Sequence, residues 1–218
     1  MSCSIVPARP WPPAGAAAQN FGNTAVRPNP ARGPRLPPAL KLSVRRQGVR
    51  PSRFLLLVSV RTQTLSLFLK HGAGLPGDAF PRYDFRRRFR VSTSRHGVGQ
   101  VMHSDRTPLG LHRIARKVGG GFPVGTIFRG RQPVGLTWQG QPDAGIVHRI
   151  LWLEGLEPGF NSGGKVDSFQ RYIYLHGFGD ETTLGRPQSN GCVHLAAADL
   201  MPLYEQLPVG TLVWIGEG

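Results

Sequence analysis

Residues 54–69 read FLLLVSVRTQTLSLFL. The first seven residues form an apolar run of strand length, residues 61–63 form a polar break, and a second run rich in β-favouring residues follows. Two such runs joined by a short polar turn are typical of a β-hairpin. We therefore expect a hairpin here, and a folded domain that begins near Arg53.

Similar patterns recur toward the C-terminus, separated by turns rich in glycine and proline. We expect further strands at residues 85–92, 111–115, 146–153, 172–175 and 211–215, and a long loop over the glycine-rich residues 119–130. Asp199 is a candidate N-cap for a helix, because apolar residues follow it at helical spacing. These are Leu200, Leu203, Tyr204 and Leu207. The chain is therefore predicted to be mostly β, sandwich-like or barrel-like, with one or two short helices.

Residues 1–52 have a different composition. They hold ten of the twenty prolines and no acidic residue, and show no sustained apolar period. We interpret them as a flexible Pro/Arg-rich tail, with the domain spanning residues 53–218. No apolar stretch approaches the roughly 20 residues that span a bilayer, and we find no clear signal peptide.

The formal net charge of +15 is concentrated at the N-terminus, where residues 1–53 hold nine of the 27 basic residues. A basic chain raises the hypothesis of nucleic-acid binding. No helix-turn-helix, RNP-like or zinc-finger pattern accompanies the charge, so nucleic acid is not the expected partner. An anionic envelope polymer or membrane surface would suit a modest positive charge equally well.

Two cysteines are present, Cys3 in the predicted tail and Cys192 in the domain. A single cysteine in a folded domain is either an inert buried residue or a nucleophile. A nucleophilic cysteine needs a nearby base, because the thiolate is the reactive form. His176-Gly177 ends a predicted strand, a rigid place from which to aim an imidazole, and Gly191 before Cys192 permits a tight turn whose N–H groups can stabilise an oxyanion.

From the residues alone, three interpretations of Cys192 stay open. It is a nucleophile with His176 as its base, an inert buried residue, or a zinc ligand together with His176 and His194. Zinc is the weaker hypothesis, because no fourth ligand lies at a recognisable spacing.

The His176-Gly177 pair and the run Ser189-x-Gly191-Cys192-Val193-x-Leu195 resemble the signature of the L,D-transpeptidase catalytic domain, also called the YkuD domain. The resemblance covers residues 53–216, and four more segments also resemble parts of that domain. These segments are residues 92–94, 107–110, 149–159 and 171–177.

The resemblance implies a β-sandwich with Cys192 attacking the carbonyl of the third residue of a peptidoglycan stem tetrapeptide. His176 would take the thiol proton and later protonate the leaving D-alanine, and the Gly177 carbonyl would orient His176. Backbone N–H groups around Gly191 and Cys192 would stabilise the oxyanion. An amine from a second stem, a D-amino acid or an envelope protein would then resolve the thioester. No metal or organic cofactor is implied, and the substrate implies the cell envelope or periplasm.

The sequence departs from the family pattern at two positions. Asn190 stands where the family often has a second histidine, and His194 where it commonly has Arg or Asn. Together with Ser189 and Gly191, these two residues are expected to bind substrate. Because His grips a carboxylate only weakly and only when protonated, the departures leave open a non-catalytic wall-binding relative. A hydrolase on the same scaffold is a second alternative, since it would differ only in whether water or an amine reaches the thioester.

Overall fold

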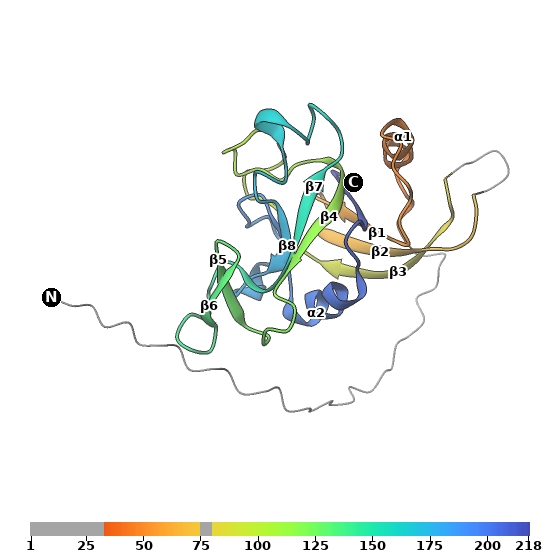
Figure 1. Cartoon of the computed structure of the whole chain (residues 1–218). Coiled ribbons are helices and arrows are strands. Elements are labelled where there is room, and N and C mark those ends of the chain that lie inside the picture. The colour runs from red at the N-terminus through yellow and green to blue at the C-terminus, as the bar shows by residue number, and fades with distance from the viewer. Residues whose placement is uncertain (1–32, 75–79) are drawn as a thin grey trace.

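The computed structural model of this protein describes residues 33–74 and 80–218. It is mostly β with two α-helices, as the sequence predicts (Figure 1). The strands are β1 (Phe54–Ser59), β2 (Thr64–Lys70), β3 (Tyr83–Arg90), β4 (Gly110–Val118), β5 (Thr126–Arg129), β6 (Gln132–Leu136), β7 (Val147–Gly155), β8 (Tyr174–Gly177), β9 (Val193–Leu195) and β10 (Leu212–Gly216). The helices are α1 (Pro38–Arg46) and α2 (Ala197–Gln206), with short 3-10 turns η2 (Gly164–Val166) and η3 (Glu181–Thr183).

The strands form one mixed sheet in the order β3-β2-β1-β10-β4-β7-β5-β6. It branches at β7, because β8 also pairs with β7 and carries β9 on its other side. Most neighbours are antiparallel, but β1 pairs parallel with β10, and β8 pairs parallel with β9. The branch therefore places β8 and β9 beside the β5–β6 hairpin, since both β5 and β8 pair with β7 at Val147.

The sheet buries apolar side chains on both faces. Along β1, Leu56 and Val58 pack into the cluster that includes Leu200 of α2, whereas Leu55 and Leu57 pack into the cluster of α1. Successive strand residues point to opposite faces, so the two helices cover opposite sides of the sheet. This explains the continuous apolar run at the start of β1, which a strand covered on one face only would not need.

Helix α1 corrects part of the predicted tail. We expected residues 1–52 to be flexible, but residues 38–46 form a helix on the sheet that buries Leu40 and Val44, one turn apart. The Ser43 hydroxyl donates to Glu157 at 2.8 Å, which ties the helix to the domain. Pro38 begins the helix at a position where its missing N–H costs nothing, so one proline of the predicted tail marks a helix start. Residues 1–32 lie outside the described residues.

Two further expectations were wrong. Residues 119–130 were predicted as loop, yet residues 126–129 form β5, which turns back into β6. Gly130 and Arg131 both have positive φ, 54° and 69°, as a two-residue type I′ hairpin turn requires. Helix α2 begins at residue 197 rather than after Asp199, and Glu181 rather than Asp199 caps it, accepting the Ala197 N–H at 2.7 Å.

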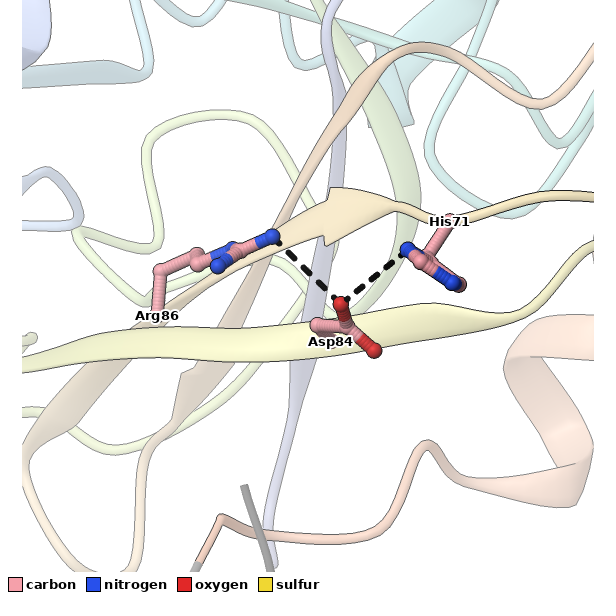
Figure 2. Close-up of polar contacts among 3 residues, drawn as sticks. All are labelled: His71, Asp84 and Arg86. Atoms are coloured by element: carbon pink, nitrogen blue, oxygen red, sulfur yellow. Dashed lines mark hydrogen bonds and ion pairs between the residues drawn. The ribbon is translucent and has the colours of Figure 1, made fainter. Parts of the chain in front are cut away.

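Strand β3 ends the sheet at its edge and carries a run of exposed arginines. Asp84 on this strand accepts from Arg86 at 3.4 Å and lies 3.5 Å from His71 (Figure 2). Arg87 pairs with Asp199 of the first turn of α2 at 2.9 Å. Charged side chains on an edge strand oppose pairing with another chain, so part of the basic charge is explained by the edge itself.

Candidate active site

The parallel pair β8–β9 brings the predicted His and Cys segments together. The register aligns Leu175 with Val193 and His176 with His194. Leu175 and Val193 point into the main core. Because successive strand residues point to opposite faces, the next residue on each strand points away from that core. His176 and His194 share that face, and their ring centroids are 4.8 Å apart. Cys192, two residues before His194, joins the same face at the end of the strand pair.

The Cys192 thiol is held by the backbone beside it. Its Sγ accepts the N–H of Tyr174 and donates to the carbonyl of Tyr172, each at 3.4 Å. The side chain is partly exposed and packs beside the aromatic cluster that contains Trp152. Burial raises the pKa of Cys192 to about 11, against the smaller lowering effects of the Tyr174 N–H and of the Arg171 charge. The resting thiol is therefore protonated at neutral pH.

His176 is buried, and one of its ring nitrogens has a defined partner. Nδ1 lies 2.7 Å from the carbonyl oxygen of Gly177, the contact that the resemblance implies. A carbonyl can only accept, so Nδ1 carries the proton in the neutral ring and Nε2 keeps a lone pair. Burial lowers the pKa of His176 to about 4, although the Gly177 bond opposes this. The imidazole is therefore neutral at pH 7 and able to act as a base.

Gly177 lies where a side chain would not fit. A Cβ at this position would lie 2.3 Å from Cδ2 of His148 and 2.7 Å from the carbonyl oxygen of Val147. His148 belongs to an irregular stretch of β7, with a positive φ of 69°, and its Nδ1 accepts the N–H of Gly125 at 2.7 Å. Because Gly177 has no side chain, its backbone, whose carbonyl bonds His176, can pack closely against β7.

Ser189 and Gly191 shape the turn that presents Cys192. The Ser189 hydroxyl donates to the Cys192 carbonyl at 2.6 Å and accepts the Gly191 N–H at 3.2 Å. Ser189 is buried, and Gly191 has a φ of 114°, which disfavours any other residue. Asn190, between them, is exposed. Of the predicted substrate-binding residues, the structure thus gives Ser189 a place inside the turn and Asn190 a place on the surface.

His194 lies inside the site as a buried, uncharged side chain. It is 5% exposed, and its ring stacks on Phe178 with centroids 4.4 Å apart and planes at 10°. Burial, with the neighbouring His176 adding to it, lowers the pKa of His194 to about 2. Its Nδ1 is buried and has no hydrogen-bond partner among the described residues. His194 therefore brings no positive charge to the position where an arginine would.

Arg171 is a residue of this site that the sequence reasoning did not single out. Its guanidinium donates to the carbonyls of Gly99, Gln100 and Arg106 at 3.1, 2.8 and 2.6 Å. These bonds hold the loop of residues 99–106 against the cysteine turn, where the Arg106 carbonyl lies 3.2 Å from the position of a Cβ on Gly191. No local pattern marks an arginine whose partners lie about 70 residues earlier in the chain, so the signal was absent.

Within residues 33–74 and 80–218, no group of three or more His, Cys, Asp or Glu side chains is arranged to hold a metal ion. In the same part of the chain, no helix has both the length and the apolar character needed to cross a bilayer.

Comparison with known proteins adds a family to this geometry. Residues 53–215 match the family model of the L,D-transpeptidase catalytic domain, YkuD. Among curated proteins, no relative matches the chain.

Several solved structures are similar in fold. Bd1075 of Bdellovibrio bacteriovorus is 15% identical, with a TM-score of 0.48 over 76% of this chain and 48% of that one. An L,D-transpeptidase from Mycobacterium smegmatis is 14% identical, with a TM-score of 0.41 over 75% and 58%. The K307A mutant of the helical cell shape determining protein Pgp2 from Campylobacter jejuni is 17% identical, with a TM-score of 0.44 over 77% and 48%. The chain thus spans about half the length of these proteins.

Proposed function

The chain belongs to the L,D-transpeptidase catalytic domain family, and from this premise we propose that it is a cysteine acyltransferase acting on peptidoglycan stem peptides. The observation that supports the proposal best is the shared face of β8 and β9. It carries Cys192 and a neutral His176 whose Nδ1 is committed to the Gly177 carbonyl, so that Nε2 is the basic atom.

The first half-reaction follows from the neutral state of both groups. Because burial raises the pKa of Cys192 and lowers that of His176, a resting thiolate–imidazolium pair is disfavoured. We infer that His176 Nε2 takes the thiol proton as Sγ attacks the carbonyl of the third stem residue. The N–H of Gly191 already contacts Ser189, so the N–H of Cys192 is the proposed oxyanion donor. The C–N bond breaks, D-alanine leaves with the proton from His176, and a thioester remains on Cys192.

The second half-reaction decides between two activities. An amine from another stem, a D-amino acid or an envelope protein lysine would attack the thioester and form a new amide bond. Water would instead release a shortened stem, as in a carboxypeptidase. Both reactions use the same first step, and the proposed site of action is the cell envelope, where the substrate lies.

The test is intact-mass spectrometry of the full chain after incubation with a carbapenem, a β-lactam expected to acylate an activated cysteine of this family. The matched pair of variants is Cys192→Ala and Cys3→Ala, which removes the other cysteine. A single adduct on the wild type and on Cys3→Ala, absent from Cys192→Ala, is the expected result. A folded wild-type protein without an adduct would overturn the proposal and favour the non-catalytic relative.

A product analysis separates transfer from hydrolysis. The protein is incubated with a stem tetrapeptide and an excess of a D-amino acid, and the products are weighed by mass spectrometry. An exchanged tetrapeptide indicates transfer to an amine, whereas a tripeptide alone indicates transfer to water.

A further inference from the structure

Three aromatic side chains form a shelf beside the candidate nucleophile. We call Trp152, Tyr172 and Tyr174 the aromatic shelf. The Trp152 ring centroid lies 5.6 Å from that of Tyr172 and 5.4 Å from that of Tyr174. Trp152 is fixed from behind, stacked on Phe169 at 4.1 Å. Tyr172 is 51% exposed, so the shelf opens to solvent on one side.

The shelf is joined directly to the thiol. The carbonyl of Tyr172 accepts the hydrogen bond from Cys192 Sγ, and the N–H of Tyr174 donates to the same sulfur, each at 3.4 Å. Two residues thus contact the reacting atom with their backbone and form the shelf with their rings. A group bound on the shelf would therefore lie beside the residues that hold the reacting sulfur.

Arg131 reaches this shelf from the turn of the β5–β6 hairpin. Its guanidinium carbon lies 4.8 Å from the ring centroid of Tyr172 and 5.1 Å from that of Trp152. A hydrogen bond with the Tyr174 side chain raises the pKa of Arg131 further, so the charge is permanent. The type I′ turn aims the side chain, and stacking on aromatic faces limits the rotation of the guanidinium.

Two other candidate cations near the thiol are occupied or uncharged. The guanidinium of Arg171 already donates hydrogen bonds to the loop carbonyls, and the imidazole of His194 is buried and neutral. Arg116 stacks over Trp152 and over Phe169, which lies outside the shelf. Arg131 stacks on Tyr172 as well as on Trp152, and it forms no ion pair with a carboxylate among the described residues.

We propose that Arg131 binds the carboxylate of the donor's leaving residue, so that the β5–β6 hairpin selects stem peptides that end in a free carboxylate. This inference rests on the proposed function, because a tetrapeptide that loses D-alanine necessarily presents that carboxylate. Arginine suits the role, since its planar fork donates to both oxygens while its face stays on the shelf. Arg131 would then supply the charge that His194 lacks.

The experiment compares two donors, a stem tetrapeptide ending in D-alanine and the same peptide ending in a carboxamide. Release of the final residue is measured by mass spectrometry for wild type, Arg131→Gln, Arg131→Lys and Arg129→Gln. Arg129, on the same hairpin, contacts Gln141 and is the matched control. Because a charged hydrogen bond is worth about 10- to 100-fold, the wild type should prefer the carboxylate by that factor.

The expected result is that Arg131→Gln loses the preference, Arg131→Lys keeps part of it, and Arg129→Gln keeps all of it. If Arg131→Gln changes the rate of release equally for both peptides, the arginine has only a structural role and the inference is wrong. If the preference instead disappears in Arg116→Gln, the carboxylate is bound by Arg116, which also overturns the inference.

A separate binding measurement distinguishes failure of this inference from failure of the proposed function. If the wild type releases no final residue from either peptide, the acyltransferase proposal fails. The affinities of both peptides for Cys192→Ala and for its double variant with Arg131→Gln, measured by calorimetry, still test the arginine. A carboxylate preference in the former that vanishes in the latter supports the inference, and equal affinities in both contradict it.

Discussion

The carbonyl oxygen of Tyr172 lies 3.4 Å from Sγ of Cys192 and accepts the hydrogen bond of the thiol. Tyr172 adopts a φ of 58°, a conformation that residues other than glycine rarely take. Backbone strain of this kind persists only where the surroundings over-determine it, and here it aims a carbonyl at the thiol. The bond stabilises the protonated form of Cys192, which has consequences for its reactivity.

The thiol of the free protein should behave as a weakly acidic one. Because burial raises the pKa of Cys192 to about 11, the thiolate fraction should still be rising well above neutral pH. In the Cys3→Ala background, the rate of alkylation by iodoacetamide should increase about tenfold per pH unit between about pH 7 and pH 10. The measurement is intact mass against time at each pH. A rate that levels off near pH 7 would reveal a resting ion pair with His176 instead.

Acid should destabilise the fold through its buried histidines. Burial lowers the pKa of His112 and His176 to about 4 and that of His194 to about 2, each from an ordinary 6.5. The unfolded chain therefore binds more protons below pH 6.5, so this stabilisation is complete above 6.5 and is lost as the pH falls toward the folded values. Each residue contributes a slope of about 1.4 kcal/mol per pH unit in that window.

Substitution of one buried histidine should make this slope shallower. In His194→Phe, the free energy of unfolding, measured in urea between about pH 4 and pH 6, should depend less steeply on pH by about one proton. The exposed His96 supplies the control, and His96→Gln should keep the wild-type slope. Equal slopes in wild type and His194→Phe would show that His194 is not buried as a neutral group.

A side chain at Gly177 should displace the Gly177 carbonyl that accepts the hydrogen bond of His176. In Gly177→Ala, the new Cβ would meet the His148 ring and the Val147 carbonyl, and overpacking of this kind costs about 1–3 kcal/mol. We expect a lower melting temperature and slower acylation of Cys192 by the carbapenem. Gly179 is unsuitable as a control because it is also crowded, whereas Gly140→Ala meets open space. Gly140 has a positive φ, so Gly140→Ala should lower stability without slowing acylation.

Helix α1 should contribute to the stability of the domain. Leu40 is fully buried against Leu55, Leu57 and Phe68, so Leu40→Ala should lower the free energy of unfolding by about 2–5 kcal/mol. Leu42 on the same helix is 66% exposed, and Leu42→Ala should change it by less than about 0.5 kcal/mol. Chemical denaturation of both variants gives the comparison. Equal, small effects would mean that α1 does not stay on the sheet.

Much of the fold follows from local pattern. The hairpin of β1 and β2 and the strand β10 could be predicted, because apolar runs of strand length and β-branched residues act over a few neighbours. Strand β9 and the β5–β6 hairpin were missed, because strands of three to five residues set among glycine-rich turns carry little pattern of their own. Helix α1 was missed because the proline content and lack of apolar period over residues 1–52 indicated a flexible tail. Its packing partners on β1 and β2 follow later in the chain.

The sequence by itself determined which reactive groups are present: a cysteine after glycine, a His-Gly pair at a strand end, and a histidine rather than an arginine at position 194. Only the tertiary structure decided the protonation states and the placement of charge. The parallel pairing of β8 and β9 buries His176 and His194 and keeps both neutral, because low-dielectric surroundings disfavour the charged imidazole. The branch at β7 brings Arg131 over Tyr172, 41 positions away in the sequence. Burial and proximity are properties of the folded chain, so no local pattern carries them.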